Sequence, residues 1–483
     1  MERFVSDNMR KEAFIQNYSK AVHEGYAAIF AGAGTSVSAG FVDWKNLVRP
    51  FAEQINLDIE KEADLVKVTQ YYSNYKRNRS TVNQEILNAF SSKEDVTEPI
   101  RILTRLPIST YWTTNYDRLI EEGLKENNRK ADVKIDEENL ANNIFDRDAV
   151  VYKMHGDVFS PHKAVITKDD YELYNEKHSL FTTALKGDLI SKTFLFIGFS
   201  FEDPNLDDIL AKVRVLLGEN TREHYCFMEK INEKYYITDD GKSREADFLN
   251  DKIRQELRIE DLKRYGIETV VLDSYSEIPS ILHQIERLHL NKSIFISGSI
   301  SSYNEVWTES KVNSFCYHLS KELVLKDYRV ISGFGLGIGS SIINGALDEI
   351  YKTKFKHVSE HLSLYPFPQV SDGTRTLKEM WTHYRKSIIS ESGICIFLFG
   401  NKLKDGKVVI ADGMKEEFRI ATELNKLVIP IFSTGEAAKE IFEVMKEDKN
   451  KYQYLEGFWE KLKNVDQEEL IRTVLNIIDK NQK

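Results

Sequence analysis

The most constraining feature of this sequence is a recurring pattern in which a short apolar run is followed by a longer, charged, amphipathic segment. In the first half, such runs occur at residues 26–32, 109–115, 149–156, 193–200, 224–229 and 267–273. Strands that are apolar on both faces and separated by helical segments indicate a parallel sheet covered by helices on each side. We therefore predict a doubly wound α/β domain whose functional site lies at the carboxyl ends of the strands.

The same pattern restarts in the second half of the chain. Apolar runs, two of them followed by glycine-rich turns, lie at 292–300, 328–341, 393–401 and 426–432. A chain of 483 residues is long enough for two or three domains. Residues 276–293 are interpreted as a connecting helix. The sequence thus predicts two Rossmann-like domains with parallel sheets, residues 1–285 and residues 290–483.

Composition and charge exclude several classes of protein. The formal net charge of -10 disfavours non-specific nucleic-acid binding, which needs clustered Lys and Arg. The three cysteines, Cys226, Cys316 and Cys395, form no CxxC pair, which argues against a structural zinc site and against disulfides. No run approaches the roughly 18–20 apolar residues of a membrane helix. We expect a soluble, cytoplasmic protein with no metal, no nucleic-acid partner and no membrane partner.

The stretch "AAIFAGAGTSVSAG", residues 27–40, predicts a tight turn after the first strand. We expect the strand to end near Gly32 and Thr35 or Ser36 to cap the following helix. Glycines let backbone N–H groups approach a diphosphate closely at a helix N-terminus. The dehydrogenase fingerprint, however, requires a third glycine at position 37, where Val37 stands. An ordinary glycine-rich turn is the alternative interpretation.

Three further stretches follow predicted strands: "TTNYD" (113–117), "KMHGD" (153–157) and "GFSFEDPN" (198–205). Together with the glycine turn they resemble the sirtuin (SIR2) family over residues 27–205. The resemblance implies an NAD site, to which it assigns Gly32, Ala33, Gly34, Thr35, Ser36, Asp43, Trp44, Asn115, Asp117, Gly198 and Ser200.

Two departures from deacylating sirtuins narrow the activity. Those enzymes carry two zinc-binding CxxC pairs and an Asp-Phe-Arg after the glycine turn, whereas this chain has no such pair and has Asp43-Trp44-Lys45. Without a peptide acceptor, water takes its place. The resemblance implies that His155 is the general base, that Asn115 positions the ribose and the attacking water, and that Asp117 orders its loop.

The second half contains "FISGSI" (295–300) and "ISGFGLGIGSSIINGAL" (331–347), which are typical of phosphate-binding turns. The stretches "YRKSIISESGICIFLFGNK" (384–402) and "DGMKEEF" (412–418) resemble the SLOG family of nucleotide-binding domains. By this resemblance Arg385 and Lys402 face phosphates, Gly413 permits close approach, Glu417 accepts hydrogen bonds from a ribose, and Phe367 stacks on a base. The implied effector pocket comprises Gly298, Ser299, Gly333, Gly335, Leu336, Gly337, Phe367, Arg385, Lys402, Gly413 and Glu417.

A SIR2 domain followed by a SLOG domain is the order found in the Thoeris anti-phage NADases, which the chain resembles over nearly its whole length. The resemblance implies an NAD glycohydrolase that consumes NAD as a substrate and has no recycled cofactor. Its activator would be a cyclic ADP-ribose isomer made by a TIR-domain partner enzyme and bound by the SLOG domain. Members of that family assemble as homotetramers or larger oligomers.

Three other functions stay open at this stage. One is an NAD-dependent protein deacylase, which the missing cysteine pairs disfavour. Another is a non-catalytic nucleotide sensor, which the presence of both Asn115 and His155 disfavours. The last is a nucleotide-hydrolysing SLOG domain that uses Glu417 catalytically.

Overall fold

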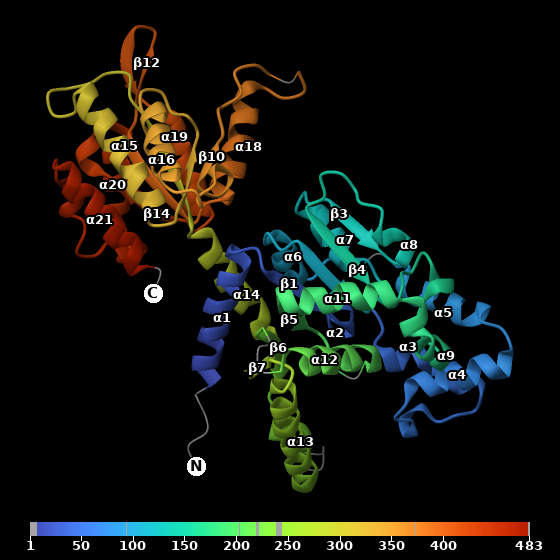
Figure 1. Cartoon of the computed structure of the whole chain (residues 1–483). Coiled ribbons are helices and arrows are strands. Elements are labelled where there is room, and N and C mark those ends of the chain that lie inside the picture. The colour runs from blue at the N-terminus through green and yellow to red at the C-terminus, as the bar shows by residue number, and fades with distance from the viewer. Residues whose placement is uncertain are drawn as a thin grey trace. The chain divides into compact units, whose positions relative to one another are not determined.

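A computed structural model describes residues 7–92, 94–201, 203–218, 222–237, 244–371 and 373–481. The chain forms two compact units, Met1–Glu286 and Arg287–Lys483, and each unit is built around a wholly parallel sheet (Figure 1). The predicted α/β class with two parallel sheets is confirmed. The division between the units falls inside helix α14 (Ile278–Leu290), within the segment interpreted as the connection.

The sheet of the first unit has seven strands in the order β3-β4-β2-β1-β5-β6-β7. At its centre, Phe30 pairs with Trp112 on one side and with Phe196 on the other. Strands β1 and β5 are buried along their whole length, as expected for strands covered on both faces. The strands are β1 (Ala27–Ala31), β2 (Thr110–Thr113), β3 (Ala131–Lys134), β4 (Ala149–Lys153), β5 (Thr193–Ile197), β6 (His224–Glu229) and β7 (Ile267–Leu272).

The edge strand β3 was not predicted, because it has four residues and only alternate side chains are buried. The helices of this unit are α1 (Asp7–His23), α2 (Ala33–Val37), α3 (Trp44–Gln54), α4 (Leu65–Lys76), α5 (Ser80–Phe90), α6 (Glu98–Arg105), α7 (Leu119–Glu126), α8 (Glu137–Leu140), α9 (Lys168–Glu172), α10 (Tyr174–Lys177), α11 (Ser179–Ser191), α12 (Pro204–Leu217), α13 (Glu245–Lys263) and α14.

Helices α3, α4 and α5 form an insertion between β1 and β2 with a hydrophobic cluster of its own. The rings of Phe51 and Tyr72 stack there at 4.8 Å between centroids. The cluster also includes Tyr116 and Val158, which follow β2 and β4. The insertion therefore packs against two of the loops that carry the predicted site.

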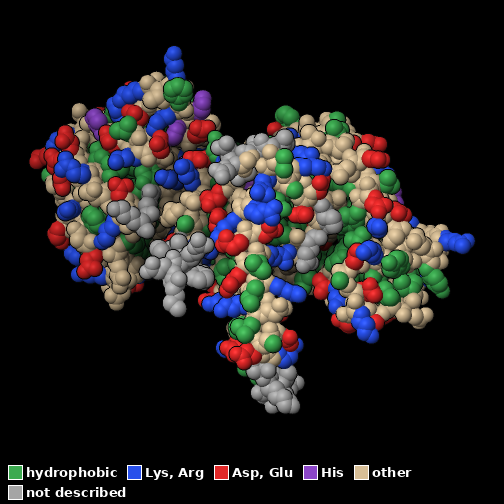
Figure 2. Space-filling model, turned by 60° about the horizontal axis from the view of Figure 1, so that its bottom comes forward, with side chains coloured by type: hydrophobic (Ala, Val, Ile, Leu, Met, Phe, Trp, Pro, Cys, Tyr) green, Lys and Arg blue, Asp and Glu red, His purple; other side chains and the backbone are tan. Residues whose placement is uncertain are grey.

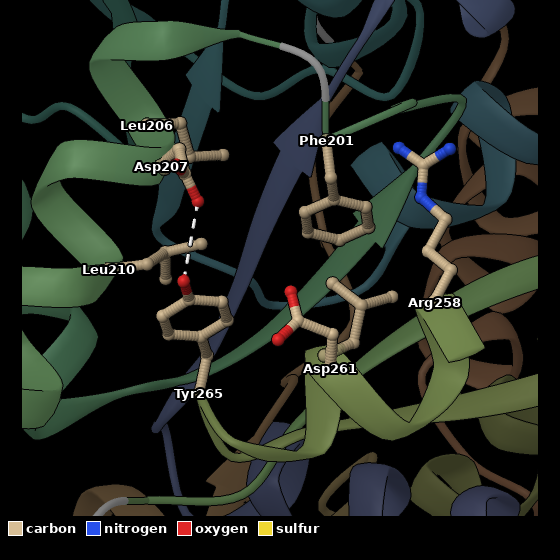
Figure 3. A pocket seen from close by; sticks show the side chains of 8 residues that line it. Phe201, Leu206, Asp207, Leu210, Arg258, Asp261 and Tyr265 are labelled. Carbon is tan, nitrogen blue, oxygen red and sulfur yellow. Dashed lines mark hydrogen bonds between the residues drawn. The ribbon is translucent and has the colours of Figure 1, made fainter.

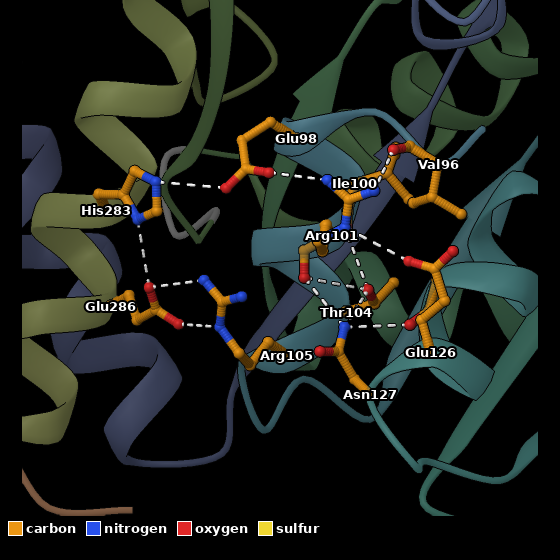
Figure 4. A network of polar contacts seen from close by, with 11 residues as sticks. Val96, Glu98, Ile100, Arg101, Thr104, Arg105, Glu126, Asn127, His283 and Glu286 are labelled. Carbon is orange, nitrogen blue, oxygen red and sulfur yellow. Dashed lines mark hydrogen bonds and ion pairs between the residues drawn. The ribbon is translucent and has the colours of Figure 1, made fainter. Parts of the chain in front are cut away.

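Helix α14 is fastened to the first unit by ion pairs with α6 (Figure 4). Both carboxylate oxygens of Glu286 accept hydrogen bonds from Arg105, one of them at 2.9 Å. His283 lies 3.4 Å from the carboxylate of Glu98, which also accepts a hydrogen bond from Arg101.

The second unit has a five-stranded sheet in the order β10-β9-β8-β11-β14. Its strands are β8 (Ser293–Ser299), β9 (Arg329–Ser332), β10 (Leu362–Leu364), β11 (Ile394–Phe399) and β14 (Leu427–Pro430), with an antiparallel hairpin of β12 (Asn401–Lys404) and β13 (Lys407–Ile410). Its helices are α15 (Glu309–Leu325), α16 (Gly339–Lys352), α17 (Val358–His361), α18 (Leu377–Ser390), α19 (Asp412–Glu423), α20 (Glu436–Glu447) and α21 (Gln467–Lys480).

Strand β11 is buried at all six residues, whereas half of the residues in the two strands of the unpredicted hairpin are exposed. On the face drawn in Figure 2, basic and acidic side chains are interspersed. Across the described residues, no helix combines the length and apolarity needed to cross a membrane.

Candidate functional site

All the predicted sirtuin-like motifs lie at one edge of the first sheet. The glycine turn follows β1, Asn115 follows β2, His155 follows β4, and the loop from Gly198 follows β5. These strands are consecutive neighbours in the order β4-β2-β1-β5. Because parallel strands end at the same edge, the four loops lie at the edge where a sheet of this kind is expected to form its site.

The glycines of the first turn allow two loop backbones to touch. Gly32 N–H donates to Ile197 O at 2.9 Å, and Gly34 N–H donates to Gly198 O at 2.8 Å. Gly198 has a φ of +62°, and a Cβ there would lie 2.5 Å from the Thr35 nitrogen. Both N–H groups are thus engaged by the β5 loop. Thr35 N–H is also engaged, since it donates to Gly32 O at 3.1 Å. Binding of a diphosphate at this turn stays a prediction.

The helix after the turn differs from the expectation. Helix α2 has five residues and its N-cap is Gly32, which makes no side-chain capping bond. The prediction that Thr35 or Ser36 caps the helix is wrong, because both lie inside it and the Thr35 hydroxyl donates back to Gly32 O at 2.8 Å. Val37 is 44% exposed, so this helix has no need of the close-packing glycine of dehydrogenases.

Asn115 holds the glycine turn from the neighbouring strand. Its Nδ2 lies within hydrogen-bonding distance of Gly32 O (2.9 Å), Thr35 Oγ1 (3.1 Å) and Ser36 Oγ (2.8 Å). The Ser36 hydroxyl in turn donates to the buried carboxylate of Asp117 at 2.5 Å. Asp117 also accepts a hydrogen bond from Leu119 N–H, which orders the loop after β2. The structure therefore brings Gly32, Thr35, Ser36, Asn115 and Asp117 together.

A buried lysine connects this cluster to the loop that carries His155. Lys153, the last residue of β4, is fully buried, and its Nζ donates to the backbone oxygens of Tyr116 and Asp117. The same ammonium pairs with Asp157 at 2.6 Å and with Glu121 at 3.4 Å. Burial acts to lower the pKa of Lys153, but the nearby carboxylates outweigh it and raise the pKa, so the side chain stays charged.

His155 is 4% exposed and lies among aromatic and acidic side chains. Its ring meets Tyr171 and Tyr174 edge-on, at 5.5 and 6.3 Å between centroids. Burial lowers the pKa of His155, and Asp203 and Asp170 only partly offset that effect. The imidazole is therefore neutral at pH 7, which is the state that a general base needs.

Sequence reasoning missed two charged residues of this site, Lys153 and Asp203. Asp203 lies in the quoted loop 198–205, and its Oδ2 is 3.2 Å from Nε2 of His155. Its other oxygen, Oδ1, accepts hydrogen bonds from Asn205 and Leu206 N–H and thereby caps α12. An Asp directly before Pro is a visible capping signal, but its partner is distant in sequence.

The remaining predicted NAD contacts are less closely tied to the cluster. Ala33 and Gly34 are exposed in the first turn of α2, and Gly198 and Ser200 are exposed in the loop after β5. Asp43 caps helix α3 by accepting from Asn46 N–H at 2.7 Å, and Trp44 packs on the cluster of the helical insertion. Their assignment to NAD stays a prediction.

The second unit repeats the close glycine packing at its own sheet edge. A Cβ on Gly335 would lie 1.9 Å from Gly298 O, and one on Gly337, at φ +76°, would lie 2.2 Å from Ile300 O. The turn is held to the end of β8 by a hydrogen bond from Ile300 N–H to Leu336 O at 2.8 Å. The side chain of Leu336 is 66% exposed.

Arg385 is the centre of the predicted effector pocket. It lies over the Phe367 ring at 5.1 Å and pairs with Glu417 at 3.2 Å and with Glu416 at 2.7 Å. A Cβ on Gly413 would lie 2.6 Å from its guanidinium. Burial raises the pKa of Glu417, against hydrogen bonds from Ser297 and Arg385 that lower it.

The other predicted effector residues lie around this centre. Gly333 faces the Phe367 ring, since a Cβ there would be 3.0 Å from Cε2. Lys402 pairs with Asp412, which directly precedes Gly413. Ser299 donates to Asn401 O at 3.1 Å. Asn401, which sequence reasoning missed, also accepts hydrogen bonds from the N–H groups of Ser301 and Ser302.

Comparisons with known proteins agree with both halves of this description. Residues 109–253 match the model of a SIR2-like domain, and residues 277–481 match the Sir2- and TIR-associating SLOG family. The chain is 46% identical to NAD(+) hydrolase ThsA of Bacillus cereus (strain MSX-D12) over 97% of its own length and 98% of the relative. It is 45% identical to NAD(+) hydrolase ThsA of Cytobacillus dafuensis over 92% and 90%. It is also 28% identical to Defense-associated sirtuin 2 of Bacillus subtilis, over 42% of this chain and 20% of that one.

Proposed function

Because this chain belongs to the family of ThsA NAD(+) hydrolases, we propose that it cleaves NAD to ADP-ribose and nicotinamide at the edge of the first sheet when a nucleotide signal binds the second unit. The observation that carries the proposal is the juxtaposition of Asn115, the glycine turn and His155 on neighbouring strands. The bond between nicotinamide and ribose already has a cationic leaving group. The enzyme therefore needs to hold the ribose, stabilise the developing positive charge and activate water.

The residues of the first site suit these tasks. The neutral, buried His155 is the proposed base, and Asn115 is the proposed ribose and water contact. Residues Gly32 to Ser36 and Gly198 to Ser200 would surround the diphosphate, with Asp43 and Trp44 closing the site from the helical insertion. Buried acidic groups near His155 favour a positively charged transition state.

The second unit is the proposed sensor for a cyclic ADP-ribose isomer made by a TIR-domain enzyme. In this structure Arg385 and Lys402 are paired with carboxylates. A bound phosphate would compete with Glu416 and Asp412 for those cations. The signal would thus rearrange the ion pairs that join α18 to α19. Such a local rearrangement can shift the balance between an inactive and an active conformation of the protein. We propose a homotetramer or larger oligomer as the working form.

The test follows nicotinamide release from NAD by chromatography, with and without each of a panel of cyclic ADP-ribose isomers. We expect at least one isomer to start release. His155→Ala should bind that isomer but lose about 10²–10⁴-fold in rate, the contribution of a general base. Arg385→Ala should lose activation and keep a folded NAD site.

Matched controls separate these effects from general damage. His318→Ala on α15 and Arg419→Ala on α19 remove exposed or half-exposed side chains of the same type and should behave as wild type. Normal activation of Arg385→Ala at a limiting concentration of the signal would refute the assignment of Arg385 to the effector pocket. Release of nicotinamide only when an acetyl-lysine peptide is supplied would replace the hydrolase by a deacylase.

A further inference from the structure

The contact between His155 and Asp203 is not explained by the roles proposed so far. It joins the loop after β4 to the loop after β5, and the side chains are 4% and 10% exposed. The 3.2 Å between Nε2 and Oδ2 is within hydrogen-bonding distance, but the two groups are not aligned, and Nε2 is a buried nitrogen without a hydrogen-bond partner. A buried polar atom left unpaired next to a carboxylate oxygen is costly unless the pair closes in another state.

The two oxygens of Asp203 have separate surroundings. Oδ1 is committed to the first turn of α12, where it accepts from two backbone N–H groups. Oδ2 receives one long hydrogen bond, from the Tyr171 hydroxyl at 3.4 Å, and otherwise faces His155. The capping bonds thus hold the carboxylate in place while its second oxygen points at the imidazole.

The loop that presents Asp203 is anchored by aromatic side chains. Phe201, two residues earlier, adopts a left-handed φ of +57°. Its ring packs against Phe196 and Phe199 at 5.1 and 5.2 Å between centroids. The same ring lines a small pocket between α12 and α13, together with Leu206 and Tyr265 (Figure 3). Asp203 is therefore presented to His155 by a packed loop.

We propose that Asp203 is a positioning residue for His155, accepting a hydrogen bond from Nε2–H when NAD is bound and thereby leaving Nδ1 as the basic nitrogen. The proposal rests on the proposed role of His155. Which imidazole nitrogen carries the proton is set by the hydrogen bond that the other one makes. Catalytic hydrogen bonds are often poorly aligned in a free enzyme and tighten in the complex, which accounts for the present misalignment.

The charges around the imidazole single out Asp203. Asp170 also acts on His155, but its charge is compensated by Arg79, whose Nη1 lies 2.8 Å from both carboxylate oxygens. Among the described residues, Asp203 has no Arg or Lys partner. The titratable groups that face His155 from the elements around it are Asp203, Asp170, Tyr171, Tyr174 and His178.

The decisive variant is Asp203→Asn in the full-length chain. Asn is as good an N-cap as Asp, so α12 keeps its cap through Oδ1. The Oδ2 position becomes an amide NH2, which carries no charge and cannot accept a hydrogen bond from Nε2–H. Nitrogen-15 NMR of the histidine rings, with the His155 signals assigned from His155→Gln, reports tautomer and pKa without any need for activity. We expect the Nε2–H tautomer of His155 to lose population and its pKa to fall, because a nearby negative charge stabilises the imidazolium.

Kinetics supply the second readout, with NAD as substrate and the activating isomer of the panel at saturation. The acid limb of kcat/KM against pH should move to lower pH in Asp203→Asn. The kcat should fall by about tenfold or more. The loss should not exceed the contribution of the base itself, about 10²–10⁴-fold. The KM for NAD should change little. Asp466→Asn, which alters the corresponding cap of α21, should leave both profiles unchanged.

Two results would overturn the inference. One is an unchanged His155 tautomer and pKa in Asp203→Asn. The other is a wild-type kcat in Asp203→Asn together with a loss in Asp203→Ala, which would reduce Asp203 to a helix cap. If the NMR shifts occur but no isomer elicits hydrolysis, the positioning contact stands and it is the proposed function that fails.

Discussion

At the scale of single residues, Lys153 is unusual because its charged side chain is fully buried. A fully buried ammonium is stabilised only when opposite charges and hydrogen-bond acceptors surround it, and here Asp157, Glu121 and two backbone oxygens do so. Those backbone oxygens belong to Tyr116 and Asp117. Lys153 is thus the point at which the loops after β2 and β4 are held together.

Replacing Lys153 by Met should lower the free energy of unfolding by about 3–5 kcal/mol, the usual loss when one partner of a buried ion pair is removed. The physical reason is that Asp157 would be left buried without a counter-charge, and Glu121 would keep only the more distant Arg118, at 3.7 Å. Urea unfolding followed by circular dichroism measures the change. Lys61→Met, at a lysine whose side chain is 80% exposed, should change stability by less than about 0.5 kcal/mol. Equal effects of the two substitutions would contradict the account.

At the scale of elements, both units have glycines where two backbone segments touch at the sheet edge at which a site is expected. In the first unit Gly34 of α2 meets Gly198 of the loop after β5, and in the second unit Gly298 of β8 meets Gly335 of the loop after β9. Glycine is required at these positions because a Cβ atom would clash with the neighbouring backbone. This packing accounts for the glycines without any ligand contact. Ligand binding at such edges needs this close approach first.

Gly198→Ala should destabilise the first unit, because the new Cβ would clash with the Thr35 nitrogen and φ is +62°. The left-handed conformation alone costs a non-glycine residue on the order of 1–3 kcal/mol. Thermal unfolding provides the measurement. Gly187→Ala is the matched control, since it lies on the exposed face of α11 with nothing within 4 Å, and it should stabilise by about 0.5–1 kcal/mol. A melting temperature unchanged by Gly198→Ala would show that the two loops do not pack as described.

At the scale of the whole molecule, the chain is two units with separate hydrophobic cores. The second core is a continuous cluster that runs from Ile294 to Ile478. Helix α14 is held to the first unit by the ion pair between Glu286 and Arg105 (Figure 4). Each unit is large enough to bury a core of its own.

We expect residues 287–483 expressed alone to unfold in one cooperative transition, because all five strands of the second sheet lie within them. Circular dichroism during thermal unfolding tests this. A fragment of residues 301–483 lacks β8, the central strand of that sheet, and should show no cooperative transition. A 287–483 fragment without a transition would mean that the second unit depends on the first.

The order of strands and motifs was predictable from local sequence, because fully buried parallel strands leave apolar runs that are visible without any partner. Strands β3 and β10 and the hairpin β12–β13 were not predicted. They are short, partly exposed or charged, so they carry no comparable signal. The helical insertion α3–α5 was also not predicted, since its packing on Tyr116 and Val158 depends on contacts distant in sequence.

By itself, then, the sequence determined the two α/β units, the strands that carry the motifs, and the residues expected at each site. Tertiary structure alone decided that β4, β2, β1 and β5 are neighbours, so that His155 lies beside Asp203 and Lys153 reaches the Asn115 loop. The physical reason is the distance along the chain over which each effect acts. Apolar periodicity and caps act within a few residues, whereas the charge and burial that set the pKa of a histidine come from side chains brought together only when the sheet forms.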